Sequence, residues 1–168
     1  AGETWYRALR RTAQDLGQVV SPDDAALAAR GLRTMQVRLA AQTQSARRIA
    51  SWLAEQPQVA RVLCPLLPDD PGHALWARDF TGGCGLFSFV LASDDPAAAA
   101  RVADNLDLFG IGYSWGGYES LALPIKPADY RSVMADQTGG RPALRLAIGL
   151  EDTDDLIADL AQALARVE

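Results

Sequence analysis

The chain has 168 residues, enough for one domain with an added helical segment. Hydrophobic residues make up 49% and charged residues 22%, a composition that favours a packed core over disorder. The net charge of −5 argues against a nucleic-acid partner, and no apolar run reaches the roughly 20 residues that would indicate a membrane partner. One histidine and two cysteines predict neither a zinc site nor a disulfide framework, and they fit a cytoplasmic protein.

Helices dominate the expected first third of the chain. Periodic apolar residues predict three of them, over residues 4–16, 21–30 and 33–56. Ser21, followed by a proline, is a typical start for the second helix, and Gly31 suits its end. In the third helix, Gln42 is predicted to lie largely off the apolar stripe. We therefore expect residues 1–56 to form a helical connecting segment.

The rest of the chain, residues 57–168, is expected to form an α+β domain. The predicted order is a strand over 59–64, a loop over 66–78, a strand over 86–91, a helix over 94–106, a strand over 112–115, an irregular segment over 124–142, a strand over 144–148 and a helix over 152–164. Residues 86–91 are almost wholly apolar, which predicts a central strand. This order predicts a small, mostly antiparallel sheet with helices on one face.

Arg145 is the most informative polar residue. Strand alternation places Leu144, Leu146 and Ile148 on the core face and Arg145 on the other face. A guanidinium in an apolar strand needs a partner, because an unpaired buried charge is costly. Its planar fork matches a carboxylate, so we expect either a ligand carboxylate or a structural salt bridge to an acid of the chain.

Other polar segments carry weaker signals. The aromatic rings, hydroxyl and glycines of residues 113–118 fit a ligand pocket and an edge strand with a turn equally well. Glycine-rich residues 81–85 predict a tight entry into a strand, since phosphate cradles lead into helices. His73 is expected to bond locally, and the acids of 151–155 to begin a helix, so no metal site is expected. Lys126 lies in a proline-flanked loop, a poor position for a Schiff-base lysine.

Six segments of the chain resemble one enzyme family in the same order and spacing. They are Gly31-Leu32-Arg33-Thr34-Met35, Val59-Ala60-Arg61-Val62, Gly72-His73 with Asp79-Phe80-Thr81-Gly82, Gly85-Leu86-Phe87-Ser88-Phe89, Tyr113-Ser114-Trp115-Gly116-Gly117-Tyr118-Glu119-Ser120-Leu121, and Leu144-Arg145-Leu146-Ala147-Ile148-Gly149-Leu150-Glu151-Asp152. From about residue 30 to the end, the chain resembles the carboxy-terminal part of the Cys/Met-metabolism family of pyridoxal-phosphate enzymes. Its Tyr-Ser-Trp-Gly-Gly form looks like the bacterial cystathionine β-lyases, whereas γ-lyases and γ-synthases typically carry an acid at the Tyr113 position.

The resemblance implies roles for four residues. Arg145 would bind the α-carboxylate of the substrate with help from Ser114, and Tyr113 and Trp115 would shape the side-chain pocket. The implied fold is the carboxy-terminal domain of a fold-type I enzyme, and the implied reaction is β-elimination of cystathionine to homocysteine, pyruvate and ammonia. In this family the lysine and the other ligands of pyridoxal 5'-phosphate lie in a large domain that precedes the matched region. We therefore expect no catalytic or cofactor-binding residue in this chain, which alone would be inert.

Implied partners are a cystathionine-like sulfur amino acid, the missing large domain and further copies in a homodimer or homotetramer. Three alternatives stay open. The chain could belong to a γ-lyase or γ-synthase of the same family. It could instead be a free-standing regulatory module that binds an amino acid, or an assembly piece whose contacts come from residues 1–56.

Overall fold

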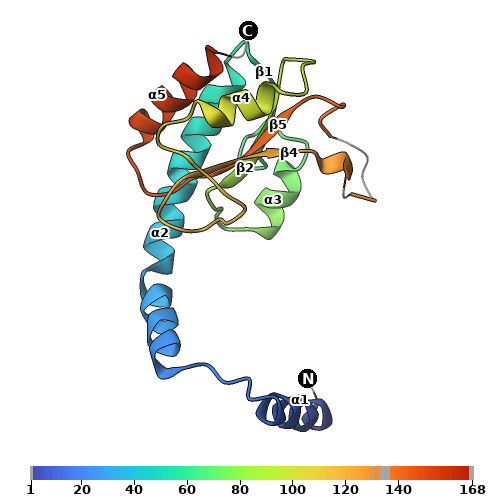
Figure 1. Ribbon diagram of the computed structural model, residues 1–168, viewed down its shortest axis with the longest axis vertical. Helices are drawn as coiled ribbons and strands as arrows, with labels where there is room; N and C mark the ends of the chain where they lie inside the picture. Colours follow the sequence, from blue (N-terminus) through green and yellow to red (C-terminus); the bar gives the residue numbers. More distant parts are fainter. Residues whose placement is uncertain (1, 130, 133–136, 167–168) are drawn as a thin grey trace. The chain divides into compact units, whose positions relative to one another are not determined.

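Figure 1 shows the computed structural model, which describes residues 2–129, 131–132 and 137–166. The elements in chain order are α1 (Glu3–Asp15), α2 (Pro22–Ala54), β1 (Val59–Leu63), α3 (His73–Asp79), β2 (Leu86–Leu91), α4 (Ala98–Asp104), β3 (Gly110–Ile111), β4 (Leu121–Ile125), the 3-10 helix η1 (Pro127–Asp129), β5 (Ala143–Ala147) and α5 (Thr153–Leu164). They fall into two compact units, Ala1–Gln36 and Val37–Glu168. No helix in the described ranges is long and apolar enough to cross a membrane.

The first unit consists of α1 and the beginning of α2. Ser21 caps α2 as predicted, because its hydroxyl accepts a hydrogen bond from the amide of Asp24 at 3.1 Å. The predicted break at Gly31 was wrong, since α2 continues through that residue as one helix. A glycine inside a helix costs about 1 kcal/mol, which the alanine, leucine and arginine residues around it can offset. None of the residues of α1 is buried.

The second unit contains a five-stranded sheet in the order β1-β2-β5-β4-β3. Every pair is antiparallel except β3 with β4, which confirms the small, mostly antiparallel sheet. The strand predicted over 112–115 was wrong, because the adjacent strands are β3, which ends at Ile111, and β4, which begins at Leu121. Pro124 obscured β4 in the sequence. It is tolerated there because β3 pairs only with Leu121 and Ala122, which leaves that side of β4 free beyond them.

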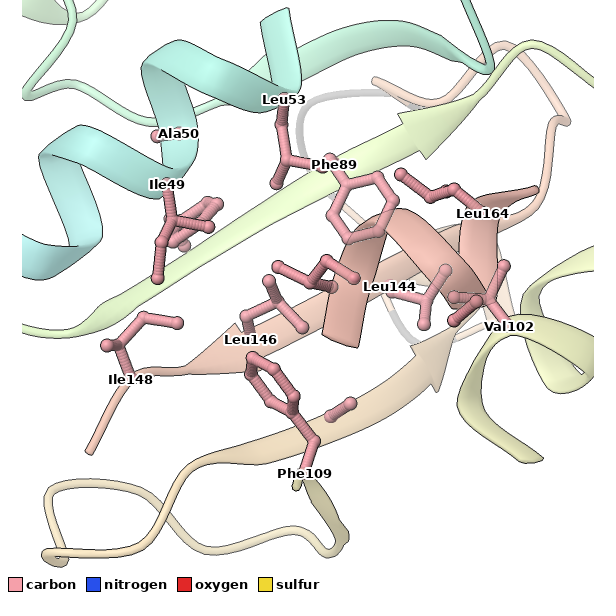
Figure 2. Close-up of a cluster of buried hydrophobic side chains, with 14 of the residues drawn as sticks. Ile49, Ala50, Leu53, Phe89, Val102, Phe109, Leu144, Leu146, Ile148 and Leu164 are labelled. Atoms are coloured by element: carbon pink, nitrogen blue, oxygen red, sulfur yellow. The ribbon is translucent and has the colours of Figure 1, made fainter. Parts of the chain in front are cut away.

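One face of the sheet carries the core (Figure 2). In the close-up, Leu53 of α2 lies beside Phe89 of β2. Ile49 lies further along the same helix, and Leu144 and Leu146 of β5 lie below. All five side chains are fully buried. Burying a side chain of this size stabilises the fold by about 1.5–3 kcal/mol, so this face supplies much of the stability of the unit.

Helix α3 lies in a segment for which the sequence predicted a loop. It has seven residues, and its N-cap residue Gly72 offers no side chain to cap it. Neither a cap nor an apolar period therefore marked it in the sequence. Trp76, from the middle of α3, packs partly buried against the core cluster.

The two cysteines differ in environment and should differ in reactivity. Cys64 is 1% exposed and its burial raises the pKa of its thiol, whereas Cys84 is exposed. We expect Cys84 to react with Ellman's reagent at least roughly 100-fold faster than Cys64, whose reaction needs local opening. The check is the time course of thiol release with and without urea, using Cys84→Ser to assign the fast phase. Equal rates for both thiols in native buffer would contradict the burial of Cys64.

Candidate functional site

Arg145 lies in the middle of β5, between Ser88 of β2 and Leu123 of β4 in the sheet register. Its neighbours Leu144 and Leu146 are fully buried on the core face, which confirms the predicted alternation. Arg145 itself is partly buried and lines an open cleft of about 1300 Å³ on the opposite face. The sheet thus presents a guanidinium at the wall of a space large enough for an amino acid.

Within the described part of the chain, the hydrogen bonds of this guanidinium come from one nitrogen, Nη2. Nη2 donates to the carbonyl oxygens of Gly112, Tyr113 and Ser114 at 3.3, 2.7 and 3.1 Å. Nε is buried and has no hydrogen-bond partner among the residues that the structure describes. Within the described ranges no acidic side chain forms an ion pair with Arg145, so the alternative of a structural salt bridge finds no partner there. The arrangement leaves a positive charge and an unused donor, which suits a carboxylate ligand.

The loop between β3 and β4 contains the three aromatic and hydroxyl candidates. It turns at Gly116, whose φ of +79° favours glycine. Tyr113 and Ser114 meet Arg145 through their backbone carbonyls, and Tyr113 also lines the cleft. The side chains of Tyr113 and Trp115 are 83% and 64% exposed. The structure therefore brings Arg145, Tyr113 and Ser114 together, while Trp115 extends from the same loop without a hydrogen bond to Arg145 among the described contacts.

The far end of this loop is held by a polar network that the sequence did not reveal. Ser120, fully buried, donates from its amide to Glu151 Oε1 at 2.6 Å and from its hydroxyl to Oε2 at 2.7 Å. The same hydroxyl accepts from the amide of Gly149 at 2.8 Å. A Cβ at Gly149 would lie only 2.3 Å from the carbonyl oxygen of Tyr118, so the two backbones are in close contact there. One strand, β5 with the residues after it, thus contacts both ends of the loop.

Gln42 of α2 contacts the same loop. Its side chain is 2% exposed, and Nε2 donates to the carbonyl oxygen of Gly117 at 2.7 Å. The prediction that it lies off the apolar stripe was wrong. Counting from Gln42, the buried residues Ala46, Ile49 and Leu53 follow at four, seven and eleven positions, which is the helical spacing of one face. This spacing was the available signal for its burial.

The remaining candidates have structural roles. His73 Nδ1 lies 2.8 Å from the carbonyl oxygen of Pro65, which confirms a local hydrogen bond. The carboxylate of Asp152 accepts from the amides of the next helix, which explains the acidic cluster as a cap. Among the residues that the structure describes, no group of three histidine, cysteine or acidic side chains is placed to hold a metal ion.

Among the described residues, neither the lysine nor the glycine-rich segment is placed as a pyridoxal-phosphate site would require. Lys126, the single lysine, is exposed after the end of β4. Within the glycine-rich segment, Gly83 is closely packed, because a Cβ there would lie 2.7 Å from the side chain of Leu66. That segment enters β2 rather than a helix, so it offers no helix N-terminus to a phosphate.

Comparisons with known proteins agree on one family. Residues 1–165 match the family described as Cys/Met metabolism PLP-dependent enzyme. Cystathionine beta-lyase MetC of Escherichia coli is 48% identical over 96% of this chain, and cystathionine beta-lyase of Salmonella typhimurium is 47% identical over 96%. The chain spans 42% of the length of each of these relatives. Proteins named cystathionine gamma-lyase also match.

A solved structure supports the same assignment. A protein described as O-acetylhomoserine (thiol)-lyase of Campylobacter jejuni superposes with a TM-score of 0.82 and is 31% identical. The match covers 95% of this chain and 37% of that protein. The fold is thus that of part of a pyridoxal-phosphate-dependent lyase, and the chain belongs to the Cys/Met metabolism family of PLP-dependent enzymes.

Proposed function

We propose that this chain is the part of a cystathionine β-lyase that binds the α-carboxylate of its substrate. The observation that carries the proposal is the state of Arg145, which lines a cleft and whose buried Nε has no hydrogen-bond partner among the described residues. A substrate carboxylate would neutralise this charge and take up the free donors. The β-lyase names of the relatives with 47–48% identity support the choice of reaction.

The other candidates would act around that contact. Ser114 would help to hold the same carboxylate, from the loop whose carbonyls already contact Arg145. Tyr113 and Trp115 are exposed on this loop, where they would form the wall around the substrate side chain. At the position of Tyr113, an acidic side chain would attract the distal ammonium group of a longer substrate. A tyrosine offers a neutral hydroxyl instead. This difference favours β-elimination as the reaction.

Pyridoxal phosphate would be held by residues outside this chain. When bound, it supplies an electron sink for cleavage next to the α-carbon. The residues of this chain would hold and orient the substrate by its carboxylate, and the chain alone would be inert. We propose as partners the lysine-bearing domain and further copies of the complete protein in a homodimer or homotetramer, within the cytoplasm.

The test joins this chain to the amino-terminal part of a curated relative. We expect the fusion to release pyruvate and homocysteine from cystathionine, and the chain alone to release neither at equal concentration. Pyruvate is followed by coupled reduction to lactate, and the thiol is identified by mass spectrometry. Release of cysteine and 2-oxobutanoate instead would contradict β-elimination and would indicate a γ-lyase. Tight binding of an amino acid by the isolated chain would favour a regulatory module.

A further inference from the structure

A buried amide contacts the loop of the candidate site from outside the sheet. Gln42 lies on the core-facing side of α2, and its 2.7 Å hydrogen bond joins residues 75 positions apart in the chain. Polar side chains this deeply buried are costly unless they are hydrogen-bonded. Its neighbours at the same helical spacing are alanine, isoleucine and leucine, so an apolar residue would fit this face. Packing alone therefore does not explain why an amide side chain is buried here.

The loop that Gln42 contacts connects two anchored ends. At one end, the carbonyls of Gly112 to Ser114 accept from Arg145. At the other end, Ser120 is bonded to Glu151, and the amide of Leu150 donates to the carbonyl of Tyr118 at 2.8 Å. Between them, Gly116 to Glu119 are exposed, and the Gly117 carbonyl is bonded to Gln42. Gln42 therefore fixes the middle of a segment that has little packing of its own.

We propose that Gln42 is a positioning residue for the carboxylate site, holding the loop so that its carbonyls orient the guanidinium of Arg145. This inference rests on the proposed function of Arg145. The three carbonyls engage Nη2 and so set the plane of the guanidinium and the direction of its free donors. If the loop shifts, the guanidinium can rotate with it, and binding of the carboxylate weakens. Because the contact is made equally in the ground state and the transition state, KM should rise while kcat stays nearly constant.

Gln42→Met in the complete, fused enzyme removes the donor and keeps the length and volume of the side chain. We expect KM for cystathionine to rise about three- to tenfold, the equivalent of one net hydrogen bond, with kcat within about twofold. In hydrogen-exchange mass spectrometry, amides of residues 113–120 should exchange faster, while those of β2 stay protected. Gln44→Met is the matched control, since Gln44 is exposed on the same helix, and both readouts should stay at wild-type values.

The results distinguish a failure of the positioning role of Gln42 from a failure of the proposed role of Arg145. Faster loop exchange with a raised KM supports the positioning role. Faster exchange with an unchanged KM overturns it, because the loop would then not orient the site. Unchanged exchange overturns it as well, since the hydrogen bond would not hold the loop. If Arg145→Ala leaves KM unchanged in the same fusion, the proposed function itself fails. The test of Arg145 does not depend on the Gln42 variant, so the two failures can be told apart.

Discussion

Replacing Arg145 with alanine is expected to raise KM for cystathionine by about 30-fold or more in the complete enzyme. Truncating one partner of a hydrogen-bonded charge pair typically costs about 2–5 kcal/mol, and about 1.4 kcal/mol corresponds to a factor of ten. The guanidinium lies on a central strand, with β2 on one side and β4 on the other, so the sheet fixes the position from which it extends. Steady-state kinetics of pyruvate release measures the effect.

Two control variants make this result specific. Arg145→Lys keeps the charge and loses the planar fork, so its KM should fall between those of the wild type and Arg145→Ala. Arg61→Ala removes another arginine that lines the same cleft from β1, and KM should stay within about threefold. A KM unchanged in Arg145→Ala would assign Arg145 a purely structural role. An equal effect of Arg61→Ala would indicate that only the overall charge of the cleft matters.

The sequence predicted the position of Arg145 because strand alternation is a local rule. Leu144 and Leu146 mark the core face of β5, and the arginine between them must face the other way. Its contacts could not be predicted in the same manner. Three of them are backbone carbonyls of a loop 31 to 33 residues away, and carbonyl positions depend on backbone geometry rather than on residue type.

The same distinction holds for the fold: elements with signals in their own sequence were predicted, and features that depend on distant residues were missed. The apolar strand β2 and the capped helix α5 were predicted because the signals lie within each element. Strand β4 was missed because its proline is a poor strand signal, and only its neighbour in the sheet makes it tolerable. Gln42 was assigned to the wrong face because its polarity was given more weight than its spacing. Burial of a polar residue is decided by its partner, which here comes from a distant loop.

The core should respond most strongly at Phe89, whose side chain is fully buried on the core face of β2 (Figure 2). Phe89→Ala should lower the free energy of unfolding by about 3–5 kcal/mol, because the lost transfer energy adds to that of a cavity bounded by close-packed neighbours. Phe80→Ala is the matched control, since that ring is 64% exposed, and we expect a loss of at most about 0.5 kcal/mol. Urea unfolding of the chain, followed by circular dichroism, measures both changes. Similar midpoints for the two variants would contradict the packing of α2 on β2 and β5, and with it the rigid support that this sheet gives to Arg145.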